Sequence, residues 1–393
     1  MMMTIKKSPA FSEAQCCENG KTKSSNYETE NSAYLSGQLI TCIGNKRKLL
    51  PFIGNAVELV RARLGKSKLA VCDLFSGSGI VARFFKQYAS LLIANDLEEY
   101  SQVINTCYLS NASEIDTEQL AMVHENLLEG LKEEQLSPGF ISRLYAPASG
   151  NIRKGERVFY TPLNARYLDT ARALISGIDR SLQPCFIAPL LSEASVHANT
   201  SGVFKGFYKN RDTGIGKFGG RRGDALSRIT GRITLPFPVF SRFECEYAVY
   251  RDDANILAAG LPELDIAYID PPYNQHPYGS NYFMLNLIAS YREPSAVSRV
   301  SGIPPDWNRS DYNRPSAAAD ALRRLAETVP ARFLLISFNS EGFIGYERMV
   351  EILDRIGTVT VIEIPYNTFR GSRNLNNRAI HVTEYLYLVE KRS

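Results

Sequence analysis

The chain has 393 residues, of which 44% are hydrophobic and 22% charged, and its formal net charge is +4. This composition is typical of globular proteins, and the length allows two domains or one large domain with an insertion. No apolar run approaches the roughly 18 residues of a membrane span, and no apolar segment of signal-peptide length opens the chain. Seven scattered cysteines without a CxxC pair and four histidines without ligand spacing indicate neither disulfides nor a metal site. We therefore expect a cytoplasmic protein that does not bind membranes.

The first part of the chain predicts a tail followed by alternating helices and strands. Residues 1–33 mix Ser, Asn, Glu and Lys without periodicity, which predicts a disordered tail. Residues 44–64 have the apolar spacing of a helix. Residues 68–85 predict a strand, a glycine-rich turn and a helix, and residues 90–100 predict a second strand.

The second part returns to this alternation after a long middle segment. From 105 to 240 the signals are mostly helical and irregular, which predicts an insertion. The elements expected after it are a strand and helix at 246–261 and strands at 264–269, 331–340, 358–366 and 381–391. This order predicts an α/β fold with a doubly wound sheet. Because no helix separates the last two strands, we expect them to pair antiparallel at the end of the sheet.

A glycine-rich turn, Asp73-Leu74-Phe75-Ser76-Gly77-Ser78-Gly79, follows the first strand. Its glycines allow a sharp turn and a close approach to a ligand, and the next helix offers free N–H groups. Asp96 ends the following strand about 20 residues on, where doubly wound folds accept hydrogen bonds from ribose hydroxyls. The turn lacks the Gly-Lys-Ser/Thr ending of a P-loop. It therefore predicts a nucleoside-containing cofactor rather than a nucleotide triphosphate, the alternative being a plain strand–helix turn.

An acid, two prolines and a tyrosine follow the strand at 264–269. Asp270 stands where the strand stops. Pro271 and Pro272 cannot donate ladder hydrogen bonds, so the chain leaves the sheet in a stiff turn that carries Tyr273. A carboxylate, exposed carbonyls and a held aromatic ring predict a site. The alternatives are a solvated strand-end acid and a packed core tyrosine.

Two segments are rich in basic residues. Residues 201–232 contain eight Lys or Arg and two Asp, a net charge of 8 − 2 = +6, with glycines and aromatic residues between them. Residues 367–378 contain three arginines and four asparagines between two predicted strands. Such segments are typical of loops that bind a polyanion, although a solvated surface loop is the alternative for each.

The motifs resemble those of a known enzyme family. Phe75-x-Gly77-x-Gly79 after the first strand and Asp270-Pro271-Pro272-Tyr273 after the fourth resemble the S-adenosylmethionine-dependent DNA adenine-N6 methyltransferases, in the group whose cofactor motif comes first. "IGNKRKLL" at 43–50 is similar to the segment that opens this group. The resemblance covers roughly residues 35–104 and 240–393. It implies a Rossmann-like methyltransferase of a restriction–modification system that acts on double-stranded DNA.

The resemblance also implies roles for the matching residues. Asp270, Pro271, Pro272 and Tyr273 would be the catalytic tetrad. The residues expected to bind S-adenosylmethionine are Lys46, Asp73, Phe75, Ser76, Gly77, Gly79, Asp96, Asp253 and Asp270. Whether Asp252 or Asp253 contacts the cofactor's adenine is open, and a helix N-cap is the alternative for either. The expected DNA contacts are Lys205, Lys209, Arg211, Lys217, Arg221, Arg222, Arg370 and Arg373.

The tetrad suits methylation of an exocyclic amine. The amine of adenine is a poor nucleophile because its lone pair is delocalised into the ring. The Asp270 carboxylate and the Pro271 carbonyl can each accept one N–H bond, which turns the lone pair toward the methyl group. Tyr273 would stack on the base after it leaves the helix.

The implied organisation is a tail (1–33), a cofactor-binding part (34–104), an inserted, mostly helical target-recognition region (105–240) and a catalytic part (241–393). One alternative is an N4-cytosine methyltransferase, which more often has Ser in place of Asp270. Others are an RNA methyltransferase, against which the basic insertion argues, and a DNA-binding module without catalysis. We expect a monomer on DNA, a restriction endonuclease that acts separately, and no metal ion.

Overall fold

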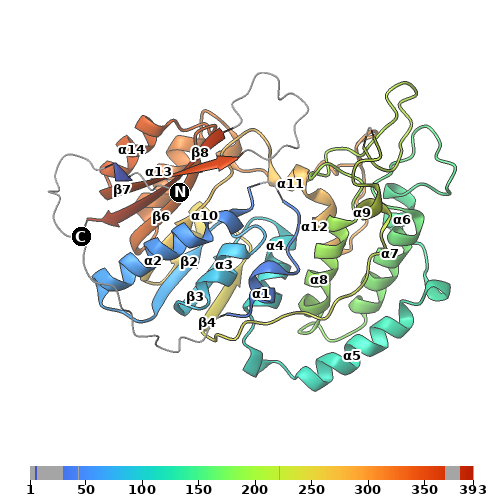
Figure 1. The fold of residues 1–393 in the computed structure, drawn as a ribbon, viewed down its shortest axis with the longest axis horizontal. Coiled ribbons are helices and arrows are strands. Elements are labelled where there is room, and N and C mark those ends of the chain that lie inside the picture. Colours follow the sequence, from blue (N-terminus) through green and yellow to red (C-terminus); the bar gives the residue numbers. More distant parts are fainter. Residues whose placement is uncertain (1–4, 7–29, 43, 221, 368–380, 393) are drawn as a thin grey trace.

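The computed structural model describes residues 5–6, 30–42, 44–220, 222–367 and 381–392. An eight-stranded sheet with the order β1-β7-β8-β6-β5-β2-β3-β4 forms one half of the molecule (Figure 1). Its strands are β1 (Ile5–Lys6), β2 (Leu69–Asp73), β3 (Ala89–Asn95), β4 (Glu246–Tyr250), β5 (Leu264–Ile269), β6 (Ala331–Asn339), β7 (Gly357–Asn367) and β8 (His381–Lys391). Strands β2 to β6 are parallel. The predicted α/β sheet is therefore confirmed.

Helices cover both faces of the sheet. The helices α2 (Leu50–Leu64) and α3 (Ile80–Phe85) pack on one face, and α10 (Ala254–Leu257), α13 (Ala318–Thr328) and α14 (Tyr346–Asp354) pack on the other. Successive strand residues alternate between the two cores: Val71 belongs to the first and Cys72 to the second. Because both faces are buried, the inner parallel strands β2, β3, β5 and β6 are largely apolar, whereas the edge strand β4 has no buried residue.

The last two strands form the expected antiparallel pair, and β8 lies between β6 and β7. In the strand order of the sheet, β8 is therefore the neighbour of the parallel strand β6, and β7 lies on the other side of β8. The short strand β1 pairs antiparallel with β7. Most of the predicted tail lies outside the described residues, and α1 (Ser32–Ser36) begins near its end.

A helical lobe forms the other half of the molecule (Figure 1). Its helices are α4 (Glu99–Leu109), α5 (Thr117–Gly130), α6 (Phe140–Tyr145), α7 (Pro162–Ser176), α8 (Gln183–Val196) and α9 (Leu226–Thr230). The helix α8 is buried on most sides and is correspondingly apolar. Helix α12 (Phe283–Ser290) follows the Asp270 turn and packs into this same core, so the lobe and the sheet are joined at the turn.

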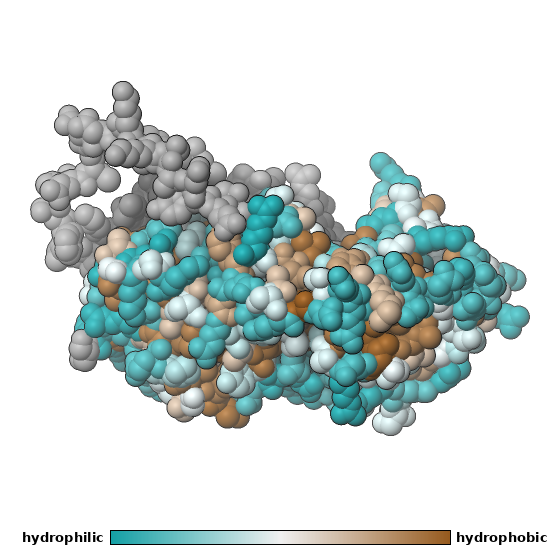
Figure 2. Space-filling view, turned by 90° about the horizontal axis from the view of Figure 1, so that it is seen from below, coloured by the Kyte–Doolittle hydropathy of each residue, from teal (hydrophilic) through white to brown (hydrophobic). Residues whose placement is uncertain are grey.

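Short helical turns complete the described structure: η1 (Lys46–Leu49), η2 (Ala112–Glu114), η3 (Glu133–Gln135), η4 (Ala258–Gly260), α11 (Tyr278–Asn281) and η5 (Asp311–Asn313). Hydrophilic residues predominate on the face drawn in Figure 2, with hydrophobic residues in patches between them. In the part of the chain that the structure describes, no helix has the length and apolar character needed to cross a membrane.

Candidate active site

The carboxyl ends of the parallel strands border one open cavity of about 940 Å³. Strand β2 lies between β3 and β5, so the chain reverses its direction of winding there, which is where open α/β sheets bind ligands. Asp73 ends β2, Asp96 follows β3, and Asp270 follows β5. The three carboxylates therefore come together because their strands are parallel neighbours, and all three line the cavity.

The glycine turn has positive φ angles at two glycines, and the carboxylate of Asp96 stabilises it. Gly77 has φ +53° and Gly79 has φ +75°, a region that glycine adopts without strain. A Cβ on Gly79 would also lie 3.0 Å from Oδ1 of Asn105. Asp96 accepts hydrogen bonds from the backbone N–H of Gly77 (2.7 Å) and of Glu98 (2.9 Å). Asp96 therefore fixes the backbone of the glycine turn through Gly77.

Asn95 fixes two loops around the cavity. Its amide nitrogen donates to the carbonyls of Leu74 and Asp252, both at 3.1 Å, and its oxygen accepts the N–H of Asp252 at 3.1 Å. All of these bonds are to backbone, and the side chain is 1% exposed. The loops after β2 and β4 are therefore held at a fixed distance.

The turn after β5 is held from two sides. The carbonyl of Tyr273 accepts the N–H of Phe343 (2.9 Å), and the carbonyl of Asn274 accepts the side-chain N–H of Asn313 (2.8 Å). The Tyr273 ring meets the edge of Phe338 at 5.7 Å between centroids. Within the described residues no hydrogen bond reaches the carbonyl of Pro271. That carbonyl is therefore available as an acceptor on a stiff turn.

Lys46 provides a buried positive charge beside this turn. It lies on η1, and its ammonium is 3.1 Å from Oδ1 of Asp270 and 3.6 Å from Oε2 of Glu384. The same nitrogen lies 5.6 Å from the centroid of the Tyr273 ring. The three charged side chains are 4%, 15% and 6% exposed, respectively, so solvent screens them little.

More acidic than basic side chains line the cavity. Burial and the nearby Asp270 raise the pKa of Asp73 to about 8, and neither of its carboxylate oxygens accepts a hydrogen bond of good geometry within the described residues. Burial raises the pKa of Asp96 to about 6 against the pull of backbone donors, and burial together with Asp96 raises that of Glu98 to about 7. Burial raises the pKa of Asp270 to about 6, although Lys46 opposes it. Such a cavity favours a cationic ligand that donates hydrogen bonds.

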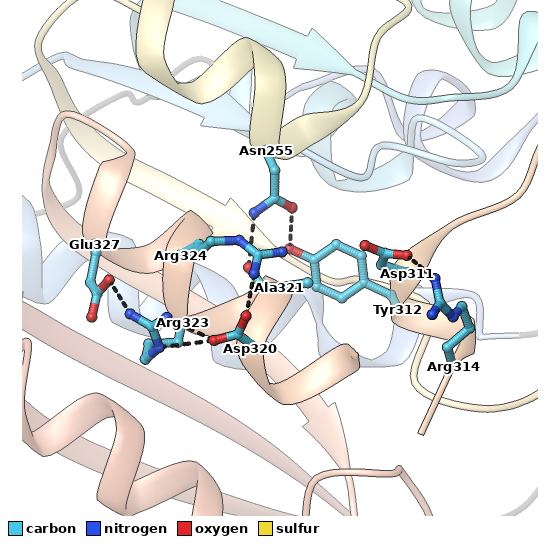
Figure 3. A network of polar contacts seen from close by, with 9 residues as sticks. All are labelled: Asn255, Asp311, Tyr312, Arg314, Asp320, Ala321, Arg323, Arg324 and Glu327. Atoms are coloured by element: carbon cyan, nitrogen blue, oxygen red, sulfur yellow. Dashed lines mark hydrogen bonds and ion pairs between the residues drawn. The ribbon is translucent and has the colours of Figure 1, made fainter. Parts of the chain in front are cut away.

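The far wall of the cavity comes from residues 308–313. Tyr312 meets the ring of Phe75 edge-on, with centroids 5.1 Å apart. Figure 3 shows its hydroxyl directed at Asn255, to which it donates at 2.9 Å, while the amide of Asn255 donates to the carbonyl of Ala321 at 2.9 Å. These bonds join η5, α10 and α13. Asp253 caps α10 by accepting the N–H of Asn255, so the N-cap role is observed, and the same residue lines the cavity.

The structure brings together most of the residues that the sequence singles out. All of the expected cofactor residues line the cavity except Gly79, which is the N-cap of α3. Of the expected tetrad, Asp270 and Pro272 line it. Sequence reasoning missed these further lining residues: Glu98, Tyr100, Tyr278, Asn308, Ser310, Tyr312 and Asn313. It also missed Glu384. The composition of residues 306–314 is equally typical of a surface loop, so it carried no signal.

The basic side chains of residues 201–232 differ in exposure and direction: some are exposed to solvent and others bind the protein itself. Lys205, Lys209, Arg211 and Arg222 are exposed. The ammonium of Lys217 instead donates to the carbonyl of Gly220 at 2.9 Å. Outside the expected set, Arg228 donates to the carbonyls of Ala198 and Thr200, and Arg232 pairs with Glu133 at 3.0 Å. Arg221, Arg370 and Arg373 lie outside the described residues.

Comparisons with known proteins show the family of the chain. Residues 43–301 match the D12 class N6 adenine-specific DNA methyltransferases, and the chain belongs to that family. It is 31% identical to the type II methyltransferase M.NlaIII of Neisseria lactamica over 89% of this chain and 98% of the relative. It is 28% identical to M.CviAII of Paramecium bursaria Chlorella virus 1, over 88% and 97%. It is 26% identical to M.FokI of Planomicrobium okeanokoites over 89% of this chain but 52% of that relative.

The protein is therefore an adenine-specific DNA methyltransferase of the kind found in restriction–modification systems. The family assigns the reaction to N6 of adenine rather than to N4 of cytosine or to RNA.

Proposed function

We propose that the cavity binds S-adenosylmethionine and that the turn after β5 presents a flipped adenine to it. The observation that carries this proposal is the buried carboxylate of Asp73, which accepts no hydrogen bond of good geometry from the described residues, in a cavity that also holds Asp96, Glu98 and Asp270. S-adenosylmethionine is a methyl donor with a sulfonium and an α-ammonium group. Its positive charges would therefore compensate the acidic side chains that outnumber the basic ones around the cavity.

The residues present fit this molecule. Asp73 would accept the α-ammonium group, and Lys46 would offset the cofactor's carboxylate. Asp96 has acceptor lone pairs left after its two backbone bonds, and these would hold the ribose hydroxyls. Asp253, or its neighbour Asp252, would receive the adenine, since both line the cavity beside Tyr312. The glycine turn keeps side chains away from the ligand.

The target adenine would enter beside Asp270. The carboxylate of Asp270 and the carbonyl of Pro271 would each accept one N–H of the amine, and Tyr273 would stack on the base. The Pro271 carbonyl needs no rearrangement because no described group occupies it. Flipping costs a few kcal/mol, which stacking and edge hydrogen bonds offset.

The exposed basic residues of the middle segment would hold the duplex. Lys205, Lys209, Arg211 and Arg222 are placed to contact phosphates, and we include Arg221, Arg370 and Arg373 on sequence grounds alone. We propose that one copy of the chain acts on DNA as the modification enzyme and that any cognate endonuclease is a separate protein.

Incubation with plasmid and labelled S-adenosylmethionine, followed by mapping of modified bases, tests the proposal. We expect N6-methyladenine within one short recurring sequence, and no label with Asp270→Ala. Glu263→Ala is the matched control, since Glu263 is an exposed acid just before β5, at the strand end away from the cavity. Methylated cytosine, label without a recurring sequence, or an active Asp270→Ala would refute the proposal.

A further inference from the structure

A second carboxylate lies beside the turn after β5, and the mechanism above does not use it. Glu384 lies on β8, which passes between β6 and β7. Its side chain is 6% exposed, and its Oε2 is 3.6 Å from the ammonium of Lys46. Among the residues that the structure describes, Lys46 is the cation that pairs with it. A buried acid in this position needs an explanation.

We propose that Glu384 is a positioning residue for methyl transfer: it holds the Lys46 ammonium while Asp270 exchanges that ion pair for the amine of the target adenine. The inference rests on the proposed function, because it requires Asp270 to receive the amine.

The exchange is needed because Asp270 is already engaged. Its Oδ1 lies 3.1 Å from the Lys46 ammonium, and the amine must compete for the same carboxylate. Lys46 is 4% exposed, so water cannot take over from Asp270. Without Glu384, the ammonium would then have only the cofactor's carboxylate as an opposite charge, and a buried ammonium that loses counter-charge is disfavoured. Glu384 removes that obstacle by keeping an opposite charge within reach.

The two distances suit such an exchange. At 3.1 Å and 3.6 Å the ammonium lies nearer to Asp270 than to Glu384, and a small shift reverses the order. The flexible four-carbon stem of lysine permits that shift, while the backbone of β8 is fixed by its ladders to β6 and β7. The strand therefore need not move.

The charges of Asp270, Glu384 and Lys46 also favour a role for Glu384 in methyl transfer. Two carboxylates around one ammonium leave net negative charge beside the nitrogen that becomes positive during transfer. Glu384 also raises the pKa of Asp270, whereas Lys46 lowers it. Among the residues that the structure describes, Cys42, Asp73, Tyr268 and Tyr278 also interact electrostatically with Asp270.

Glu384→Gln in the full chain tests the role, with Glu390→Gln as the matched control. Glu390 lies on the same strand and the same face, but it pairs with Arg63 and Arg332 at the surface. In Glu384→Gln we expect the single-turnover methylation rate to fall about tenfold or more, because Lys46 stays on Asp270. Binding of S-adenosylmethionine, measured by calorimetry, should stay within about twofold. The acidic limb of the rate profile should move to lower pH, because the charge that raised the pKa of Asp270 is gone.

A wild-type rate in Glu384→Gln would overturn the inference. A slow variant whose acidic limb does not move, or whose thermal stability and cofactor affinity fall with the rate, would show a merely structural role and would overturn it as well. If Glu384→Gln does not fold, Glu384→Asp decides: an intermediate rate supports the role, and a wild-type rate excludes it. An active Asp270→Ala would refute the proposed function itself, whereas an inactive Asp270→Ala with a normal Glu384→Gln would refute only the role of Glu384.

Discussion

The ammonium of Lys46 lies 3.1 Å from Oδ1 of Asp270, so the segment ahead of the glycine turn neutralises the acid that follows β5. Both side chains are largely buried, and each is the other's nearest opposite charge. Removing one partner of such a pair leaves the other uncompensated. Here Glu384 remains as a second partner for Lys46, which bears on the first prediction.

Asp270→Ala should lower the methylation rate at least about a hundredfold, the usual scale for losing one aligned electrostatic contact. The protein should still fold, because Lys46 keeps Glu384. Cofactor and DNA affinity should survive, since neither depends mainly on that carboxylate. Rates from labelled methyl transfer and binding by calorimetry check this. A folded variant with full activity would contradict the mechanism.

Tyr273→Ala should differ from Asp270→Ala in base flipping. It removes a stacking surface worth about 1–3 kcal/mol per base, so the extruded base should be less populated. A 2-aminopurine at the target position reports this as a smaller fluorescence increase on binding. Asp270→Ala serves as the comparison and should stay near the wild-type signal. Equal signals in the two variants would argue against stacking by Tyr273.

Binding of S-adenosylmethionine should depend on pH through Asp73. Its pKa is about 8 in the free protein, so the side chain is largely protonated at pH 7, and pairing with an ammonium group requires the charged form. Binding should therefore release a proton and weaken as the pH falls below about 8. Calorimetry in buffers of different ionisation enthalpy measures the release, which Asp73→Asn should abolish. No proton release in the wild type would place the ammonium elsewhere.

The same raised pKa predicts a stability effect with a definite sign. The folded state holds the Asp73 proton more tightly than the unfolded state, whose value is near 3.8, so this group's contribution to stability falls as the pH rises between about 4 and 8. Asp73→Asn removes that penalty. Without ligand, the variant should gain melting temperature relative to wild type more at pH 8 than at pH 5. An equal gain at both values would exclude this linkage.

Charge reversal at Lys209, Arg211 and Arg222 should weaken DNA binding and flatten its salt dependence, because fewer counterions are released. Arg348→Glu on α14 is the control, since it is also exposed but lies on the sheet half of the molecule (Figure 1). Fluorescence anisotropy over a series of salt concentrations gives the slope. An unchanged slope in the triple variant would mean that the segment does not contact phosphate.

The sequence alone determined the sheet's strands, except β1, and the order of its motifs. Runs of apolar residues define the inner strands, the glycines at 77 and 79 allow the positive φ angles of the turn, and Pro271 and Pro272 end β5. These are local effects of side-chain shape and backbone conformation. The sequence therefore predicted where the strands end, and parallel strands bring those ends to one edge.

Only the tertiary structure decided which distant groups meet there. Glu384 reaches Lys46 because β8 passes between β6 and β7, and nothing in the residues around Glu384 specifies that order. Tyr312 becomes part of the cavity wall through Asn255 and α13. Lys217 belongs to the basic segment by sequence, yet it donates inward to Gly220. These outcomes depend on long-range packing and burial, which set the direction of a side chain and the strength of its charge, and which no local pattern encodes.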